Sequence, residues 1–216
     1  MATGMLATEL QQGRRTLRPP RQIDFAALLG PAAWARLPAA VQSRFAVHSS
    51  ADVTIYAGAM LVRASLAGRL LAQACRLIGT PLAPWTGDDV PVEVAVYPDR
   101  GALVWDRTYR FAGRPPVMVS SRKIAGADGG LLEVVRGGLG MALTVTEEAG
   151  ALHFRSRFYF LTLGALRLAI PSLLTPGAAH VIHRDIGDGR FRFSLEFVHP
   201  WLGETMFQDG EFADPA

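Results

Sequence analysis

The 216-residue sequence predicts an α+β fold, in which a strongly curved antiparallel β-sheet of about 8–10 strands packs on N-terminal helices. Three observations support this prediction. Helical patterns are confined to residues 24–78, apolar and polar residues mostly alternate with a period of two from Val90 onward, and turn segments such as "DRG", "AGADGG", "EEAG" and "GDG" separate the alternating runs. Because so many consecutive strands are hard to keep open and flat, we expect the sheet to curl into a half-barrel or barrel.

The chain is expected to begin with a flexible Arg/Pro-rich leader, residues 1–22, followed by a single domain, residues 23–216. The segment "QQGRRTLRPPRQ" carries four arginines and two prolines without a hydrophobic period. The alternative interpretation is a basic arm that contacts an anionic partner or a membrane surface. No internal repeat or change of composition indicates a second domain.

The helical part is predicted to hold short helices followed by one longer helix. Asp24 is predicted to cap "FAALLGPAAWARL", and Pro31 and Pro38 divide this region into short pieces. The segment "SLAGRLLAQACRLIG" has the clearest helical period in the chain, and Gly79 and Pro81 end it. Its apolar stripe is expected to face the core and consists of Leu66, Leu70, Ala74 and Leu77.

Short strands are predicted throughout the rest of the chain. They are "ADVTIYAGAMLV", "VPVEVAVY", "ALVWDRTYRF", "PPVMVSSRKI", "LLEVVR", "MALTVT", "ALHFRSRFYF", "AHVIHRD" and "RFRFSLEFVH". The segment "LTLGALRLAIPSLLTPG" is too rich in leucine and proline for a plain strand. We therefore predict that it is a loop with a helical turn that covers the sheet.

Composition excludes several classes of protein. Half of the residues are hydrophobic and 19% are charged, so a substantial core is available. The formal charge of +3 comes almost entirely from scattered arginines, since Lys123 is the only lysine, and this argues against a nucleic-acid partner. A run of about 18 uncharged apolar residues and an apolar signal region are both absent from the sequence, which predicts no membrane span. Together with the single cysteine, Cys75, these features predict a cytoplasmic protein.

The sequence also lacks the common cofactor and catalytic motifs. It has no GxxxxGK[ST], GxSxG, HExxH or CxxC, and "GGLG" at 137–140 lies between two predicted strands, so we predict neither a cofactor nor a metal. His183 and Asp185 share a face of a predicted strand, with His180 on the other face, and ordinary surface histidines are the preferred interpretation. His153 aligns with Arg155 and is expected to face solvent.

Arg107 is the candidate functional residue that the alternation indicates. In "WDRTYRF" the side chains of Trp105, Arg107, Tyr109 and Phe111 share one face, which a sheet would bury. A guanidinium cannot shed its proton, so burying it without a partner costs several kcal/mol. Three partners stay open: an ion pair with Glu133, an anionic or carbonyl group of an apolar ligand, or water at a rim.

The interior of the curved sheet is predicted to be an apolar cavity with Arg107 as its polar anchor. Ser156 is the polar residue on the phenylalanine face of "FRSRFYF", and it is interpreted either as a pocket hydroxyl or as a small residue where the sheet bends. The expected lining consists of Trp105, Arg107, Tyr109, Phe111, Ser156, Phe158 and Phe193.

Several motifs follow one another along residues 26 to 212: "WDRTYRF", "LLE" before "GG", "LRLAIPSLLTP", "DGRFRF", and "HPWLG" followed by "DG". This order resembles the bacterial family called domain of unknown function 4166. The positions that match the pattern of this family are Trp105, Arg107, Phe111, Glu133, Pro171, Asp188, Gly189, Arg190, Phe191, Phe193, Pro200, Gly203 and Gly210.

Two positions depart from the pattern of that family. Gln208 stands where the family usually has a tyrosine, and Glu211 where it often has an aromatic residue. The departures predict either a different packing of the last strand or an altered pocket. The resemblance implies no established activity. Because members often occur fused to, or encoded near, a saccharopine-dehydrogenase-like or short-chain reductase domain, it implies a separate oxidoreductase as a partner.

Three hypotheses of function follow. The leading one is a small-molecule-binding domain for an apolar or amphipathic ligand, including an anionic one. The second is a cofactor-independent enzyme (a cyclase, isomerase or lyase) in which Arg107 stabilises negative charge while Glu133 or Tyr109 exchanges protons. The third is an interaction module that docks on a reductase, which a large exposed apolar patch on the helices would favour.

Overall fold

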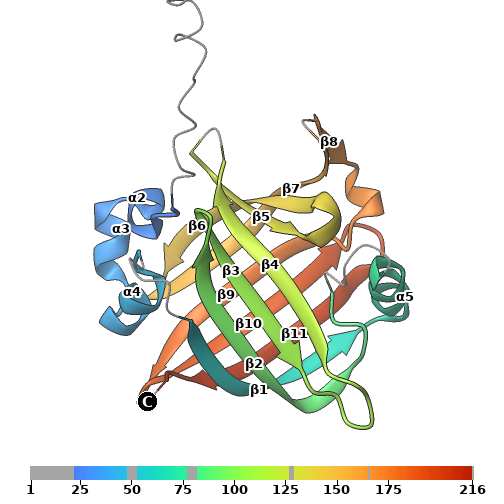
Figure 1. Ribbon diagram of the computed structural model, residues 1–216, viewed down its shortest axis with the longest axis horizontal. Helices are drawn as coiled ribbons and strands as arrows, with labels where there is room; N and C mark the ends of the chain where they lie inside the picture. Colours follow the sequence, from blue (N-terminus) through green and yellow to red (C-terminus); the bar gives the residue numbers. More distant parts are fainter. Residues whose placement is uncertain (1–21, 48–52, 77–81, 127–128, 165, 216) are drawn as a thin grey trace, which may run out of the picture.

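The computed structural model describes residues 22–47, 53–76, 82–126, 129–164 and 166–215, and these form a closed antiparallel β-barrel with helices at its ends (Figure 1). Within these residues eleven strands are hydrogen-bonded in the order β6-β5-β4-β3-β2-β1-β11-β10-β9-β7-β8. An additional pairing of β6 with β7 closes the ring and leaves β8 as an extra strand on β7. The predicted α+β fold with a barrel-like sheet is therefore confirmed.

Strands that are consecutive in the chain are nearly all neighbours in the sheet, which makes the barrel an antiparallel meander. They are β1 (Thr54–Ala64), β2 (Gly87–Asp99), β3 (Ala102–Tyr109), β4 (Val117–Ala125), β5 (Leu131–Val135), β6 (Leu139–Glu148), β7 (Ala151–Leu163), β8 (Leu166–Ile170), β9 (Ala178–Gly187), β10 (Arg190–His199) and β11 (Gly203–Ala213).

Tight turns produce this meander. Residues 100–101, 149–150 and 188–189 each join two paired strands, and both residues of each pair have positive φ. Such turns have the twist that antiparallel hairpins require, and a glycine in the second position adopts it without strain. The segments "DRG", "EEAG" and "GDG" therefore predicted the hairpins correctly.

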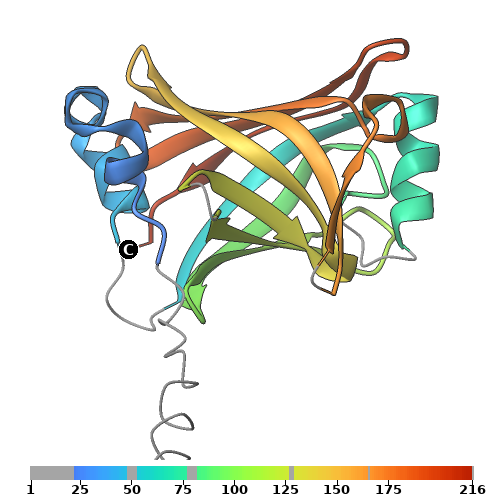
Figure 2. The same ribbon diagram turned by 90° about the horizontal axis from the view of Figure 1, so that it is seen from above.

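Three short helices cover one end of the barrel: α2 (Phe25–Leu29), α3 (Pro31–Arg36) and α4 (Ala39–Phe45) (Figures 1 and 2). The Asp24 side chain accepts a hydrogen bond from the Ala27 amide and caps α2, as predicted. Phe25 and Phe45 are buried in the barrel core. The predicted leader, residues 1–22, lies outside the described residues except for Gln22.

The helix α5 (Leu66–Cys75) lies at the opposite end of the barrel, and the prediction of its core face was wrong for Leu66, Leu70 and Ala74, while Leu77 lies outside the described residues (Figure 2). Leu66 and Leu70 are 66% and 63% exposed, whereas the buried residues of the helix are Gly68 and Ala72. A Cβ atom on Gly68 would lie 1.9 Å from the carbonyl oxygen of Thr205, so the helix crosses β11 in near-contact with its backbone. A crossing this close needs the small residues of the helix, and Leu66 and Leu70 are turned outward.

The segment predicted to be a loop after β7 is in part a strand. β9 pairs only with the first half of β7, from Ala151 to Arg155, and β8 pairs back on the second half. β8 thus forms hydrogen bonds with backbone groups of β7 that β9 does not reach. This pairing explains why the leucine-rich segment forms a strand. The predicted helical turn is present as a 3₁₀ helix, η3 (Ser172–Leu174).

Among the described helices, none is long and apolar enough to cross a membrane.

Candidate functional site

A cavity of about 170 Å³ lies inside the barrel. It runs from Phe45 of α4, which is buried, to Leu174 of η3, which is 72% exposed. The cavity is therefore closed at the α2–α4 end and reaches the surface at the end where α5 lies. A single water molecule needs about 10–15 Å³ by the same measure, so the space suits a small organic molecule.

Most of the cavity wall is apolar, and a group of charged side chains lies on three neighbouring strands. Arg107 comes from β3, Lys123 from β4 and Glu133 from β5, and all three line the cavity. Lys123 and Glu133 are directly opposite each other in the β4–β5 register. Lys123 Nζ lies 3.4 Å from Glu133 Oε1, and Arg107 Nη2 lies 4.0 Å from the same oxygen. We call these three residues the charged triad.

The remaining contacts of the triad are with a hydroxyl and with aromatic rings. Arg107 Nη1 donates a hydrogen bond to the Ser121 hydroxyl at 3.3 Å. The Arg107 guanidinium carbon lies 5.7 Å from the Trp105 ring centre and 5.8 Å from that of Phe193. Lys123 Nζ lies 4.5 Å from the Trp105 ring centre, and such cation–π contacts partly replace the hydration that burial removes.

Burial and charge together determine the protonation of the triad. Burial and the neighbouring charge of Arg107 together lower the pKa of Lys123 to about 8, although the charge of Glu133 opposes the shift. Burial alone would raise the pKa of Glu133, but the charges of Lys123 and Arg107 hold it below the usual value. At neutral pH the triad therefore carries two positive charges and one negative charge in a largely apolar cavity.

Tyr109 and Gln208 form a second polar pair in the cavity wall. The Tyr109 hydroxyl donates a hydrogen bond to Gln208 Oε1 at 2.8 Å, and both side chains are buried. Burial raises the pKa of Tyr109, so the phenol stays protonated. Gln208 thus lines the cavity, whereas Glu211 is exposed and lies 3.5 Å from Arg190 on the outside.

Two cavity-lining groups lack hydrogen-bond partners among the described residues. They are the Trp105 indole nitrogen and both ring nitrogens of His183. Burial lowers the pKa of His183 to about 3, and the charge of Arg44 adds to the effect, so the ring is neutral. Buried polar groups without a partner are uncommon, and these three nitrogens have almost no accessible surface of their own.

The expectation that the histidines lie on the surface was wrong. His183 and Asp185 share a face, but that face is inward: His183 packs against Phe191 at 4.4 Å between ring centres, and Asp185 accepts a hydrogen bond from Arg44. His153 is also buried, on the outside of the barrel, with its Nδ1 2.9 Å from Nε2 of His180. No group of three or more metal-ligating side chains occurs in the described part of the chain.

Of the predicted lining residues, Trp105, Arg107, Tyr109 and Phe193 line the cavity. The other three do not. Phe111 is buried beyond the cavity, with its ring stacked on Tyr109 at 5.9 Å, and the Ser156 hydroxyl accepts a hydrogen bond from the Ala179 amide. Phe158 is 48% exposed.

A β-bulge explains the misplacement of Phe158. In the pairing of β6 with β7, Ala142 is opposite Phe158 and Leu143 is opposite Ser156, so one residue between them is extra. An extra residue reverses the alternation beyond it. Phe154, before the bulge, faces inward, and after the bulge Tyr159 lines the cavity in place of Phe158, donating a hydrogen bond to the Gly177 carbonyl at 2.8 Å.

Lys123 is the site residue that sequence reasoning missed. Two signals were present: it is the only lysine in an arginine-rich chain, and it shares a strand face with Val119 and Ser121. All three line the cavity. Alternation applied to "PPVMVSSRKI" as it was applied to "WDRTYRF" would have placed Lys123 on the same strand face as Val119 and Ser121, but it could not give the register with β3, in which Arg107 is opposite Val119.

The comparisons with known proteins identify a family without assigning an activity. A family profile described as domain of unknown function (DUF4166) matches residues 37–212, which include α4, α5 and the strands described above up to the last residue but one of β11. The search of curated proteins and the search of solved structures found no significant match.

Proposed function

Because the chain belongs to the domain of unknown function 4166 family (DUF4166), whose description names no activity, we propose its function from the cavity. The barrel binds a small apolar or amphipathic molecule whose anionic or carbonyl group lies against Arg107. The observation that carries this proposal is the placement of the charged triad in an otherwise largely apolar cavity that opens at one end of the barrel.

Charge favours a guest with an electron-rich polar end. The triad has one more positive than negative charge when Lys123 is protonated, and the Arg107 guanidinium has donors to spare beyond its contact with Ser121. A carboxylate or carbonyl oxygen would accept hydrogen bonds from that guanidinium, and the apolar walls would contact the rest of the molecule. Such a mixture of apolar lining and a few convergent polar groups is typical of ligand sites.

A matched pair of probes tests this proposal. Octanoate and octanol both have eight carbon atoms and differ at the polar end, and their binding is measurable by titration calorimetry. We expect the full-length protein to bind octanoate about tenfold more tightly than octanol, because only the carboxylate can form an ion pair with Arg107 through two acceptor oxygens.

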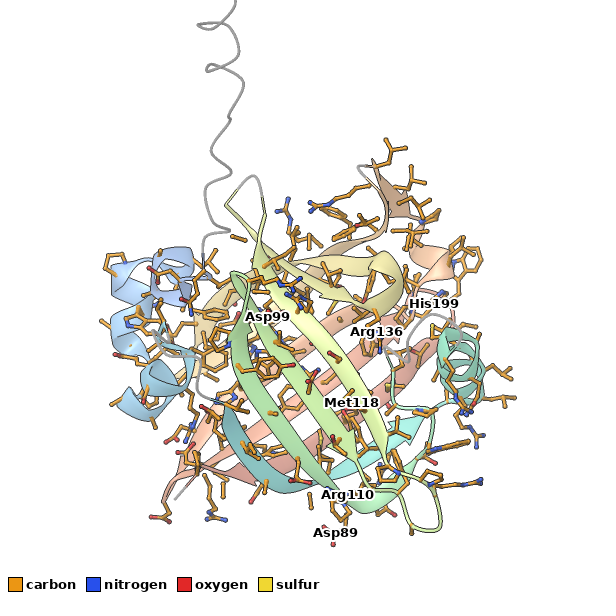
Figure 3. The ribbon with its side chains drawn as sticks, viewed as in Figure 1. Asp89, Asp99, Arg110, Met118, Arg136 and His199 are labelled. Atoms are coloured by element: carbon orange, nitrogen blue, oxygen red, sulfur yellow. The ribbon has the colours of Figure 1, made fainter. Side chains whose placement is uncertain are left out.

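Substitution of the arginine sharpens this test. Arg107→Met should weaken octanoate binding by about ten- to a hundredfold, which is the range for hydrogen bonds to a charged group. Arg110→Met is the control, since Arg110 follows the same strand but lies outside the cavity, where it pairs with Glu93 (Figure 3). Equal binding by the two variants, or no binding of either probe by the unmodified protein, would contradict the proposal.

A cofactor-independent cyclase, isomerase or lyase is the second candidate. The observation that favours it is that Arg107 and Glu133 share one cavity, at 4.0 Å from each other. Tyr109 is a weaker candidate for proton exchange, because its hydroxyl is engaged by Gln208 and its pKa is raised by burial. Lys123, with a pKa of about 8, has the affinity for protons that exchange near neutral pH requires. Recovery of a bound ligand as a chemically different product would favour this function over simple binding.

The third candidate is docking on a reductase or another protein. Exposed apolar residues gather near the open end of the cavity, on α5, η3 and the β10–β11 turn, and include Leu66, Leu70, Leu174, Trp201 and Leu202. These elements adjoin one another: the Ser65 amide bonds to the Thr205 carbonyl, and the Thr205 hydroxyl bonds to the Pro176 carbonyl. Exposed patches of this kind often mark interaction sites. Co-purification of a reductase that is lost on Trp201→Ser would favour this function.

A further inference from the structure

We propose that Lys123 captures aldehydes or ketones inside the cavity as a covalent imine, so that the barrel holds a carbonyl compound through a bond to Nζ. This inference rests on the cavity being a binding site, as proposed above. It goes further by naming the class of ligand and the atom to which the ligand becomes attached.

The position of the amine is the first argument. Lys123 lines the cavity from β4, and its side chain is almost wholly removed from solvent. Its Nζ lies between the Glu133 carboxylate, at 3.4 Å, and the face of the Trp105 ring, at 4.5 Å. A guest in the cavity therefore meets this amine in a pocket where a carboxylate is already close to the nitrogen.

The protonation state of the amine is the second argument. Only a neutral amine attacks a carbonyl carbon. Burial lowers the pKa of Lys123 to about 8, with Arg107 acting in the same direction and the Glu133 charge opposing both. About a tenth of the amine is then neutral at pH 7, against well under a thousandth for a solvent-exposed lysine.

The neighbouring groups are arranged for each part of the reaction. The nitrogen lone pair forms a bond to the carbonyl carbon, and the electrons of the C=O double bond move to oxygen. That oxygen develops negative charge on the side of the cavity where Arg107 and the Ser121 hydroxyl lie, 3.3 Å from each other. The triad thus supplies both the nucleophile and a group that stabilises the developing charge.

Loss of water then completes the imine. Glu133, 3.4 Å from Nζ, carries the two protons of the attacking amine one after the other from the nitrogen to the carbonyl oxygen, which departs as water. The overall change is R–CHO + H₂N–Lys → R–CH=N–Lys + H₂O, in which nothing is oxidised or reduced. The imine nitrogen then binds the proton that the ammonium released before the attack, so the product regains the positive charge that contacts Glu133 and Trp105.

Reductive trapping tests this inference directly. The full-length protein is incubated with octanal and sodium cyanoborohydride, which converts an imine into a stable secondary amine, and the adduct is located by mass spectrometry of peptides. Because Lys123 is the only lysine, the amino terminus is the only other primary amine of the backbone or side chains, and peptide mapping separates the two. We expect one octyl group on Lys123.

A variant with its lysine outside the cavity tests whether the cavity speeds the reaction of the amine with octanal. The double variant Lys123→Met, Arg100→Lys transfers the single lysine to a position whose arginine side chain is 90% exposed. We expect Lys123 to be labelled at least about tenfold faster at pH 7 than the lysine of the double variant, because its pKa is lower and the cavity concentrates the aldehyde. Equal rates would overturn the inference.

Binding of octanoate, measured on the same sample, separates this inference from the function on which it rests. If octanoate binds and octanal leaves Lys123 unlabelled, the covalent step is wrong and the binding function stands. If octanoate does not bind and Lys123 is not labelled, both proposals fail.

Discussion

The two ends of the barrel are built differently. At the α2–α4 end, aromatic rings pack on one another: Phe45 meets Phe25 edge to face at 5.1 Å between ring centres and lies tilted by 34° against Phe154 at 5.9 Å. A buried arginine, Arg44, also ties α4 to β9 and to the end of the chain by bonding to Asp185 and Asp214. At the other end α5 crosses β11 on a glycine and an alanine, Leu66 and Leu70 are exposed, and the cavity reaches the surface.

This contrast separates stability from access. The buried aromatic residues at the α2–α4 end contribute free energy of folding, whereas the α5 end buries less apolar surface and leaves room for a guest. The charged triad lies between the two, on β3, β4 and β5. Its charges are expected to cost stability, because burial removes them from water.

The largest expected effect is at the closed end. Phe45→Ala removes a ring that contacts Phe25, Phe154, Trp105 and His183. We expect the free energy of unfolding, measured by urea denaturation, to fall by about 3–5 kcal/mol. The matched control is Phe158→Ala, a half-exposed phenylalanine, for which we expect a change below about 1 kcal/mol. Similar losses for both variants would remove the distinction between the two regions.

A smaller effect concerns the triad and depends on pH. The pKa of Lys123 is about 8 in the folded protein and 10.5 in the unfolded chain, so the unfolded state binds more protons between these values and stability rises with pH across that window. The gain attributable to Lys123 is on the order of 3 kcal/mol at most, is complete above pH 10.5 and is lost as the pH falls through 8.

Comparison with a variant isolates this contribution. Burial raises the pKa of Cys75 and of several tyrosines, which has the opposite effect at alkaline pH, and these groups are common to both proteins. The difference in unfolding free energy between the unmodified protein and Lys123→Met should therefore rise between pH 8 and 10.5. A difference that is flat across this range would show that the amine is solvated.

The smallest expected effect is at the open end. Leu70→Gln replaces a leucine that is 63% exposed on α5, and we expect the free energy of unfolding to change by less than about 0.5 kcal/mol. A loss of about 2 kcal/mol or more would show that the leucine stripe packs on a core after all, as the helical period alone suggested.

The fold and part of the site could be predicted from local patterns. Alternation in "WDRTYRF" correctly placed Trp105, Arg107 and Tyr109 together, because the side-chain period of a strand is a property of the strand itself. The same rule failed at Phe158, since a single extra residue opposite β6 reverses the alternation and nothing in "FRSRFYF" marks it. It failed again on α5, where the closeness of the crossing with β11 outweighed the helical period.

The sequence by itself determined that the chain makes a curved antiparallel sheet from tight hairpins and that an arginine lies on its inward face. Only the tertiary structure decided that Lys123 and Glu133 lie opposite each other beside that arginine, and that one end of the barrel is filled with aromatic rings while the other is open. The physical reason is distance along the chain. Turns and side-chain periods arise between near neighbours, whereas the register between strands and the packing of helices on a barrel depend on residues far apart in sequence.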